Sequence, residues 1–470
     1  MSSSQQTKNH GADNNNDSSY QQVQEDGDSL TFTNPDLREA PQYQDKIWAL
    51  LFWIHLAIMI PIMVLNLSAD GVLEHANGST VSYVGIVVFC GLVGVVSLVA
   101  SITTLGFMIT YSEGLVQTAL ILSVAMSGVL AVLGFMAGQT VMGIFGIIFF
   151  CIGICYAKLV WPRIPFAAAN LSSALSAVHM NMGLTTVAYA LTLVAFGWTI
   201  LWVLSLGEAA TGGNPNAGIV FLLLVSYYWV HQVLSNIVHV TTAGTIGTWW
   251  FVPTEASSCW SPAIKDSLKR ATTYSFGSIC LGSLLVSIVQ ALRSMAAMAR
   301  QNDDLQMLVC IIDCILGLLQ DLIEYLNMWS YVYVGLYGFS YLEAGRNVMT
   351  LFQQKGWTVI ITDDLANNVL FLMSLVVGLL TGIVGWILNS TIPALLYNMD
   401  LAGSPAACSF LIGFIVGFGF CSIVMSVVGS AVNTVIVCFA ESPAEFETNH
   451  PALSAKMRGA WMQAWPDLQF

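Results

Sequence analysis

The sequence predicts an all-α polytopic membrane protein with about ten transmembrane helices. Of its 470 residues, 56% are hydrophobic and 9% are charged, whereas about 25% of the residues in soluble domains are charged. A helix needs about 20 consecutive apolar residues to cross the hydrocarbon layer, and a soluble domain of this length could not bury that much apolar surface. Apolar runs of this kind occupy residues 48–67, 83–109, 115–136, 140–159, 184–206, 219–251, 272–298, 370–388 and 407–439.

The polar ends of the chain divide it into three parts. Residues 1–46 contain eight acids and three bases and almost no aliphatic runs, a composition typical of disordered segments. We therefore expect a disordered acidic N-terminal tail at 1–46, a transmembrane domain at 47–440 and a C-terminal tail at 441–470.

The few basic residues predict how the chain is oriented. Lysines and arginines cluster in four segments, which the positive-inside rule assigns to the cytosol. These segments are 158–163, 265–270, 346–355 and 456–458. Both tails are then cytosolic and the loop at 69–81 is external, so that Asn77, which begins a glycosylation sequon, is expected to be a glycosylation site.

The segment 163–180 is too polar to span the membrane, although its apolar residues recur at helical spacing. It predicts either an interfacial amphipathic helix or a cytosolic extension of the preceding span.

The run at 219–251 carries hydrogen-bonding side chains where lipid would penalise them. On a helix, Tyr228, Gln232, Asn236 and His239 lie along one side. A polar stripe inside a span faces the bundle interior or a watery cavity. Such groups either hydrogen-bond across helices or line a solute pathway, and for the stripe as a whole we favour the pathway.

The segment 305–352 predicts a broken or re-entrant element. It collects Asp313, Asp321 and Glu324 on one helical face and ends in a glycine-punctuated aromatic stretch, YVYVGLYGFSYLEAGRNV. A helix lying on the membrane surface would also expose acids, but such helices carry Lys or Arg on their polar face. None occurs from 305 to 327, which favours a cation-attracting surface.

Small residues recur at four-residue spacing in the later spans and predict close helix packing. The pairs are Gly378 and Gly382, Gly413 and Gly417, and Ser426 and Ser430. For Ser430 and Asn433 we expect hydrogen bonds between helices rather than a place on the pathway.

Signatures of catalysis and of metal binding are missing from the sequence. It has no GxSxG, Walker, HExxH or dinucleotide-binding motif, so we expect neither an enzyme nor an ATP-driven pump. His231 and His239 are two helical turns apart, whereas helical zinc ligands lie about three or four residues apart. We expect no metal, no cofactor and no nucleic-acid partner.

Four segments resemble the choline transporter-like family, and in particular its fungal and protist branch named after sensitivity to high pH. They are YYWVHQVLSNIVHVTTAGTIGTWWF at 227–251, RATTYSFGSICLGSLL at 270–285, the stretch at 331–363 and CFAESP at 438–443. The resemblance covers about residues 42–465. It implies about ten spans with both ends in the cytosol, and facilitated or proton-linked movement of choline and related amines across the plasma membrane.

Aromatic side chains in these segments are candidates for binding the quaternary ammonium of choline, because ring faces attract cations. The candidates are Tyr228, Trp229, Tyr274, Tyr331 and Tyr337. Trp249 and Trp250, at the end of their span, are instead expected in the interfacial aromatic belt.

We therefore predict a multi-pass plasma-membrane carrier for a small organic cation such as choline, surrounded by membrane lipids. The substrate would lie between the helix at 227–251 and the element at 305–346, because broken helices build such sites at midplane. Gln232, Asn236 and His239 would contact it, and Asp313, Asp321 and Glu324 would attract it. The alternatives are a membrane scaffold or sensor of pH or lipid state, and a passive channel.

Overall fold

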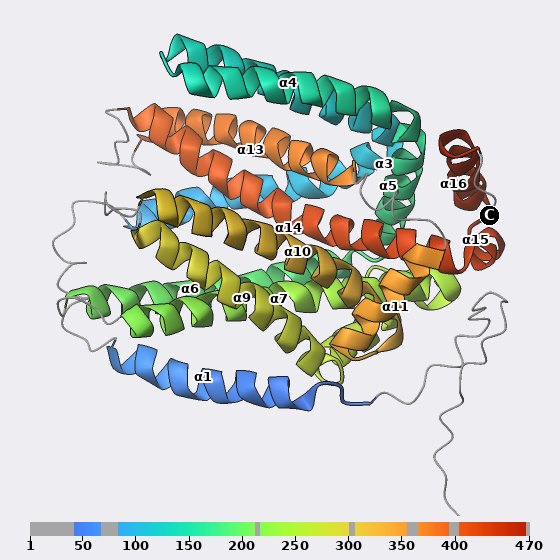
Figure 1. Cartoon of the computed structure of the whole chain (residues 1–470), viewed down its shortest axis with the longest axis horizontal. Helices are drawn as coiled ribbons and strands as arrows, with labels where there is room; N and C mark the ends of the chain where they lie inside the picture. Colours follow the sequence, from blue (N-terminus) through green and yellow to red (C-terminus); the bar gives the residue numbers. More distant parts are fainter. Residues whose placement is uncertain are drawn as a thin grey trace, which may run out of the picture.

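The computed structural model describes residues 42–66, 83–211, 217–299, 306–354, 365–393 and 404–466. In these ranges the secondary structure is helical, without a β-strand. The long helices lie side by side in one bundle (Figure 1). They are α1 (Lys46–Asn66), α3 (Tyr83–Met136), α4 (Thr140–Val160), α6 (Gly183–Thr211), α7 (Ala217–Phe251), α9 (Phe276–Ala299), α10 (Gln306–Tyr337), α13 (Ala366–Thr391) and α14 (Pro405–Glu441).

The bundle confirms the all-α polytopic membrane fold. Among the described residues, 8 helices are long and apolar enough to cross a membrane. One of them is α3, which is 54 residues long and departs from helical geometry at Tyr111. A count of about ten spans stays a prediction; it would be met if α3 crosses once on each side of Tyr111 and α10 crosses as well.

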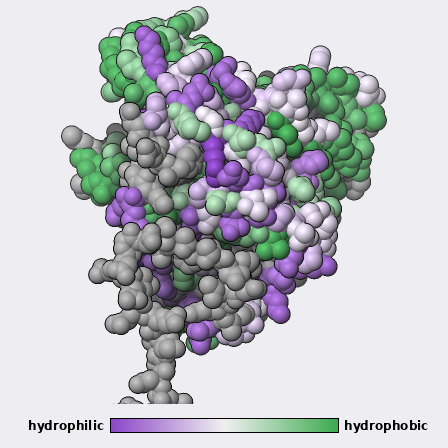
Figure 2. Space-filling view, turned by 90° about the vertical axis from the view of Figure 1, so that its right-hand side faces the viewer, coloured by the Kyte–Doolittle hydropathy of each residue, from purple (hydrophilic) through white to green (hydrophobic). Residues whose placement is uncertain are grey.

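Five shorter helices gather at one end of the bundle, at the right of Figure 1, where the first described residues of the chain also lie. They are α5 (Ile164–Met180), α8 (Pro262–Thr272), α11 (Tyr341–Gln354), α15 (Pro443–Asn449) and α16 (Pro451–Ala464). Figure 2 shows hydrophilic residues over the middle of this end face and apolar residues towards its upper margins. We call this end of the bundle the end face.

The segment at 305–352 forms two helices with a break between them. α10 is a continuous helix of 32 residues, and α11 begins after residues 338–340. Gly338 has a φ of +77°, a left-handed conformation that glycine adopts without a steric penalty. The predicted break therefore lies near the end face, after a long uninterrupted helix.

The segment 163–180 differs from a membrane-surface helix. Here α5 follows a 3-10 turn at Trp161–Arg163 and is buried over most of its residues. It packs against α3, α14 and α16, and the Asn170 amide donates to the carbonyl of Val432 at 3.4 Å. Its small side chains, alanine and serine for the most part, permit this burial.

Trp249 and Trp250 are not in an interfacial belt, so that prediction is wrong. Their exposed fractions are 1% and 0%, because the C-terminal segment covers them. Trp250 stacks on Phe446 with a centroid distance of 3.9 Å, and Trp249 stacks on His450 at 3.9 Å.

The same C-terminal segment caps α7. The Asn449 amide donates to the carbonyls of Trp250 and Phe251 at 2.9 and 3.0 Å, and His450 Nε2 donates to that of Trp249 at 2.9 Å. The last carbonyls of a helix have no partner within it, so these side chains complete the end of α7. Burial lowers the pKa of His450, which keeps its imidazole neutral in this position.

Close packing of α13 on α14 follows the small residues, as predicted. A Cβ atom at Gly413 would lie 2.6 Å from the carbonyl oxygen of Thr381 and 3.2 Å from the Cα of Gly382. Side chains this close cannot be accommodated without moving a backbone. Glycine at these positions therefore allows the two helices to touch.

We expect Gly413→Ala to destabilise the protein by about 1–3 kcal/mol, because the added methyl overpacks the α13–α14 contact. The measurement is thermal unfolding of the purified protein in detergent. Gly419→Ala is the matched control, since a Cβ atom there meets nothing within 4 Å. Equal melting temperatures for the two variants would contradict this account of the packing.

Candidate functional site

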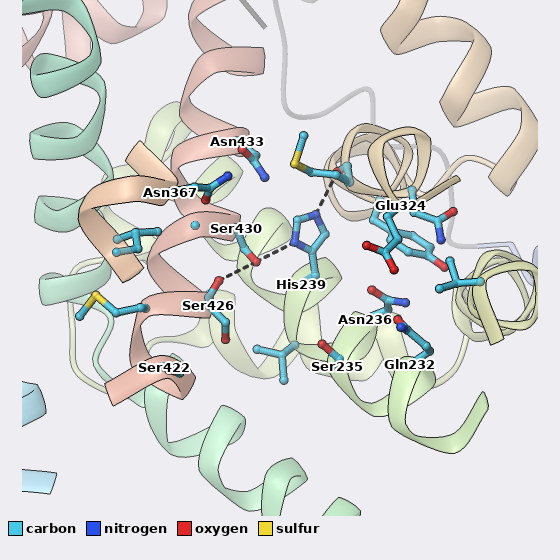
Figure 3. A pocket seen from close by; sticks show the side chains of 18 of the residues that line it. Gln232, Ser235, Asn236, His239, Glu324, Asn367, Ser422, Ser426, Ser430 and Asn433 are labelled. Carbon is cyan, nitrogen blue, oxygen red and sulfur yellow. Dashed lines mark hydrogen bonds between the residues drawn. The ribbon is translucent and has the colours of Figure 1, made fainter. Parts of the chain in front are cut away.

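A cavity of about 490 Å³ lies among α7, α9, α10, α13 and α14. Its polar lining comes from helices far apart in the sequence (Figure 3). The polar side chains that line it are Gln232, Ser235, Asn236, His239, Glu324, Asn327, Tyr331, Asn367, Ser374, Ser422, Ser426, Ser430 and Asn433. Ligand sites typically have volumes of about 300–1,000 Å³, so the cavity is large enough for a small solute.

The polar stripe on α7 (Tyr228, Gln232, Asn236 and His239) both hydrogen-bonds across helices and borders a cavity. Its members bond to neighbouring helices, and three of them also line the cavity. The Asn236 amide donates to Ser283 Oγ of α9 at 2.9 Å, and the Gln232 amide approaches Gln290 Oε1 at 3.4 Å. Tyr228 bonds to Ser294 of α9 and does not contribute to the lining.

His239 joins three helices at the centre of the site. Its Nε2 lies 3.0 Å from the carbonyl oxygen of Met328 in α10, and its Nδ1 lies 2.6 Å from Ser430 Oγ in α14 (Figure 3). A carbonyl only accepts, so Nε2 carries a proton. The Ser430 hydroxyl also lies 3.0 Å from the carbonyl oxygen of Ser426, so its one proton is shared between this carbonyl and Nδ1.

Glu324 faces the α7 stripe across the cavity, close to Asn236 and Gln232 (Figure 3). The Gln320 amide donates to one oxygen of its carboxylate at 2.7 Å, and the Gln290 amide approaches the same oxygen at 3.5 Å. The other carboxylate oxygen is not held by these two amides. Glu324 therefore has an oxygen that could face a solute.

An ion pair lies next to this acid. Arg293 Nε lies 3.1 Å from Asp313 Oδ1, and Arg293 Nη1 donates to Gln320 Oε1 at 2.7 Å. Asp313 is thus paired with an arginine and is not part of the cavity lining. Asp321 is exposed on α10 and also lies outside the lining.

A second polar stripe, on α14, was missed by the sequence reasoning. Ser422, Ser426, Ser430 and Asn433 line the cavity, and they follow the same spacing as Tyr228, Gln232, Asn236 and His239 on α7. Ser430 makes the interhelical hydrogen bond that we expected, but it and Asn433 also border the cavity. The repeated spacing is the available signal; from the sequence it predicts helix packing for Ser426 and Ser430 and interhelical hydrogen bonds for Ser430 and Asn433.

α13 contributes residues that no sequence motif indicated. Asn367 and Ser374 add polar groups, and Phe371 adds an aromatic ring at the rim of the cavity. Asn367 lies in the first turn of α13, on the end-face side of the bundle.

The predicted aromatic residues do not gather around the cavity. Tyr331 lines it while its hydroxyl donates to the carbonyl of Ile279 at 3.1 Å. Trp229 is buried and donates to the carbonyl of Cys280, and Tyr274 lies against Tyr43. Tyr337 donates to Glu441 at 2.5 Å.

The expected glycosylation site, Asn77, lies outside the described residues.

The charge of the lining favours a cation. Among the described residues that border the cavity, Glu324 is the one acid, and neither Lys nor Arg occurs. The described part of the chain also has no group of three His, Cys, Asp or Glu side chains suited to a metal ion. The geometry is therefore that of a polar cavity inside the helix bundle that is large enough for a small solute.

The sequence profile of the plasma-membrane choline transporter matches residues 140–444. The chain belongs to this choline transporter family. The matched region begins at α4 and contains α7, α9, α10, α13 and α14, the helices that supply the cavity lining. Membership in a transporter family indicates that the chain is a membrane transporter.

Relatives of this chain occur in fungi and in an amoeba. Protein PNS1 of Mycosarcoma maydis is 27% identical over 462 residues, covering 92% of this chain and 86% of that protein. A CTL-like protein of Dictyostelium discoideum is 26% identical over 428 residues, covering 88% and 74%. Protein pns1 of Aspergillus fumigatus is 28% identical over 353 residues, covering 69% of this chain and 64% of that relative.

We expect that water reaches the cavity of this protein. In a variant lacking the native cysteines, Asn236→Cys should react with a charged methanethiosulfonate reagent, because its side chain borders the cavity. Ile237→Cys is the control, since Ile237 is buried on the same helix turn. Labelling is measured by mass shift of the protein in intact membranes; no labelling at either position would show that the cavity is dry.

Proposed function

We propose that the chain is a plasma-membrane solute carrier that moves choline or a similar organic cation by facilitated or proton-linked transport. The observation that carries this proposal is the polar cavity inside the helix bundle, whose described lining residues include a single acid and neither Lys nor Arg. Polar groups inside a membrane bundle are costly and mark solute pathways when they line a cavity.

The chemistry of the lining suits both ends of choline. Glu324 supplies a negative charge. The ring faces of Tyr331 and Phe371 could contact a quaternary ammonium, and each such cation–π contact contributes up to ~2 kcal/mol of binding free energy when water is excluded. The hydroxyl of choline could bond to Asn236 or Ser430, whose polar groups border the same space.

The orientation that we propose has the end face in the cytosol. Lys158 lies in the last turn of α4 and Arg163 in the turn that follows it. Arg346 lies on α11, and Lys456 and Arg458 lie on α16; both helices are at the end face (Figure 1). Segments rich in Lys and Arg remain in the cytosol. Both termini of the chain would then be cytosolic.

We expect purified protein in lipid vesicles to take up radiolabelled choline faster than protein-free vesicles do. Gln232→Ala should lower the initial rate because the amide lines the cavity, whereas Gln463→Ala on the exposed surface of α16 should leave the rate unchanged. An imposed pH gradient distinguishes the two modes, because only proton-linked uptake responds to it. A wild-type rate equal to that of empty vesicles would exclude choline as the substrate.

Neutralising Glu324 tests the assignment of a cation. A carboxylate about 4 Å from a cation contributes about 1–4 kcal/mol, depending on the local dielectric constant. We expect Glu324→Gln to raise the KM for choline about tenfold, equivalent to about 1.4 kcal/mol.

Glu343→Gln is the matched control for this charge change, because Glu343 lies on α11 and bonds to Ser340 away from the cavity. An unchanged KM in Glu324→Gln, with normal folding, would remove the electrostatic argument for a cationic substrate.

A further inference from the structure

A second cavity of about 290 Å³ lies beside the first, between α6, α7 and α14. Three residues, Ser235, Val238 and Ser426, line both cavities. The wall between the two spaces is therefore built partly from two of the smallest polar side chains.

The lining of the second cavity is mostly uncharged and rich in aliphatic side chains such as Leu191. Several of its polar groups already have partners. Thr192 donates to the carbonyl of Ala188 at 2.8 Å, Thr199 bonds to the carbonyl of Ala195 and to His231, and Ser426 donates to the carbonyl of Ile423 at 2.8 Å. Among the described residues that line it, none is Asp, Glu, Lys or Arg.

The second cavity lies at the lipid side of the bundle. Phe196 lines it and is 62% exposed, and the adjacent Leu193 and Val194 of α6 are 71% and 57% exposed. These apolar side chains belong to a predicted membrane span, so their exposed surface faces hydrocarbon. An aliphatic chain could reach the second cavity without crossing a polar barrier.

Building on the proposed function, we propose that the substrate class extends to amphiphilic quaternary ammonium cations. The ammonium group occupies the first cavity near Glu324, and an alkyl arm passes Ser235 and Ser426 into the second cavity. The occupant is the arm of the transported cation rather than the acyl chain of a bilayer lipid. The reason is the shared wall, which places the second cavity directly beside the cavity whose described lining contains Glu324.

The experiment measures the affinity of a homologous series of alkyltrimethylammonium ions, from tetramethylammonium to octyltrimethylammonium. Binding to the purified protein in lipid nanodiscs is measured by calorimetry. Each methylene that enters an apolar site should tighten binding about threefold to fourfold. Ala195→Leu fills the second cavity and should abolish this increase while leaving tetramethylammonium and choline binding at the wild-type values.

Val194→Leu is the matched control, because Val194 neighbours Ala195 on α6 but does not line the cavity. Partition of the long ions into lipid is the same for all variants and so cancels in the comparison. Phe196→Ala provides a second test without overpacking, and it should weaken the long ions while sparing the short ones.

Each outcome has a defined meaning. An equal dependence on chain length in wild type, Ala195→Leu and Phe196→Ala overturns the second cavity as the site of the arm, as does the absence of any dependence. In either case intact binding of choline leaves the proposed function in place. Failure of choline and tetramethylammonium to bind the wild type, with no uptake, overturns the proposed function and this inference together.

Discussion

Hydrogen bonding along α7 is the constraint on which the rest of the bundle depends. Inside a membrane, a polar side chain needs a protein partner or water, because lipid offers neither donors nor acceptors. Asn236 meets this requirement through α9, and His239 meets it through α10 and α14. Three of the helices that surround the cavity, α9, α10 and α14, thus supply partners to α7.

The helices of the bundle meet through two kinds of contact. Glycines such as Gly413 bring α13 and α14 into backbone contact, which leaves no room for a side chain at those positions. Longer polar side chains hold α7 to α9, α10 and α14 by their tips, which leaves room between the backbones. The cavity lies where helices meet through the second kind of contact, and the closely packed α13 and α14 form part of its wall.

Much of this arrangement could be predicted from the sequence, because membrane thickness and side-chain periodicity act locally. The fold class, the α7 stripe and the close helix contacts all followed from such local patterns. The rotation of each helix about its axis did not, since neighbours such as Tyr228 and Trp229 point in different directions and only tertiary packing decides which one meets a cavity. Serine adds an ambiguity of its own, because Ser426 and Ser430 have the spacing of packing residues and also border the site.

The cap that Asn449 and His450 place on α7 has a practical consequence for handling the protein. The residues that finish α7 lie in the C-terminal segment, so a C-terminal affinity tag or fluorescent fusion is attached to the segment that makes this cap. A tag at the opposite terminus leaves the junction intact and is the safer choice for purification and transport assays.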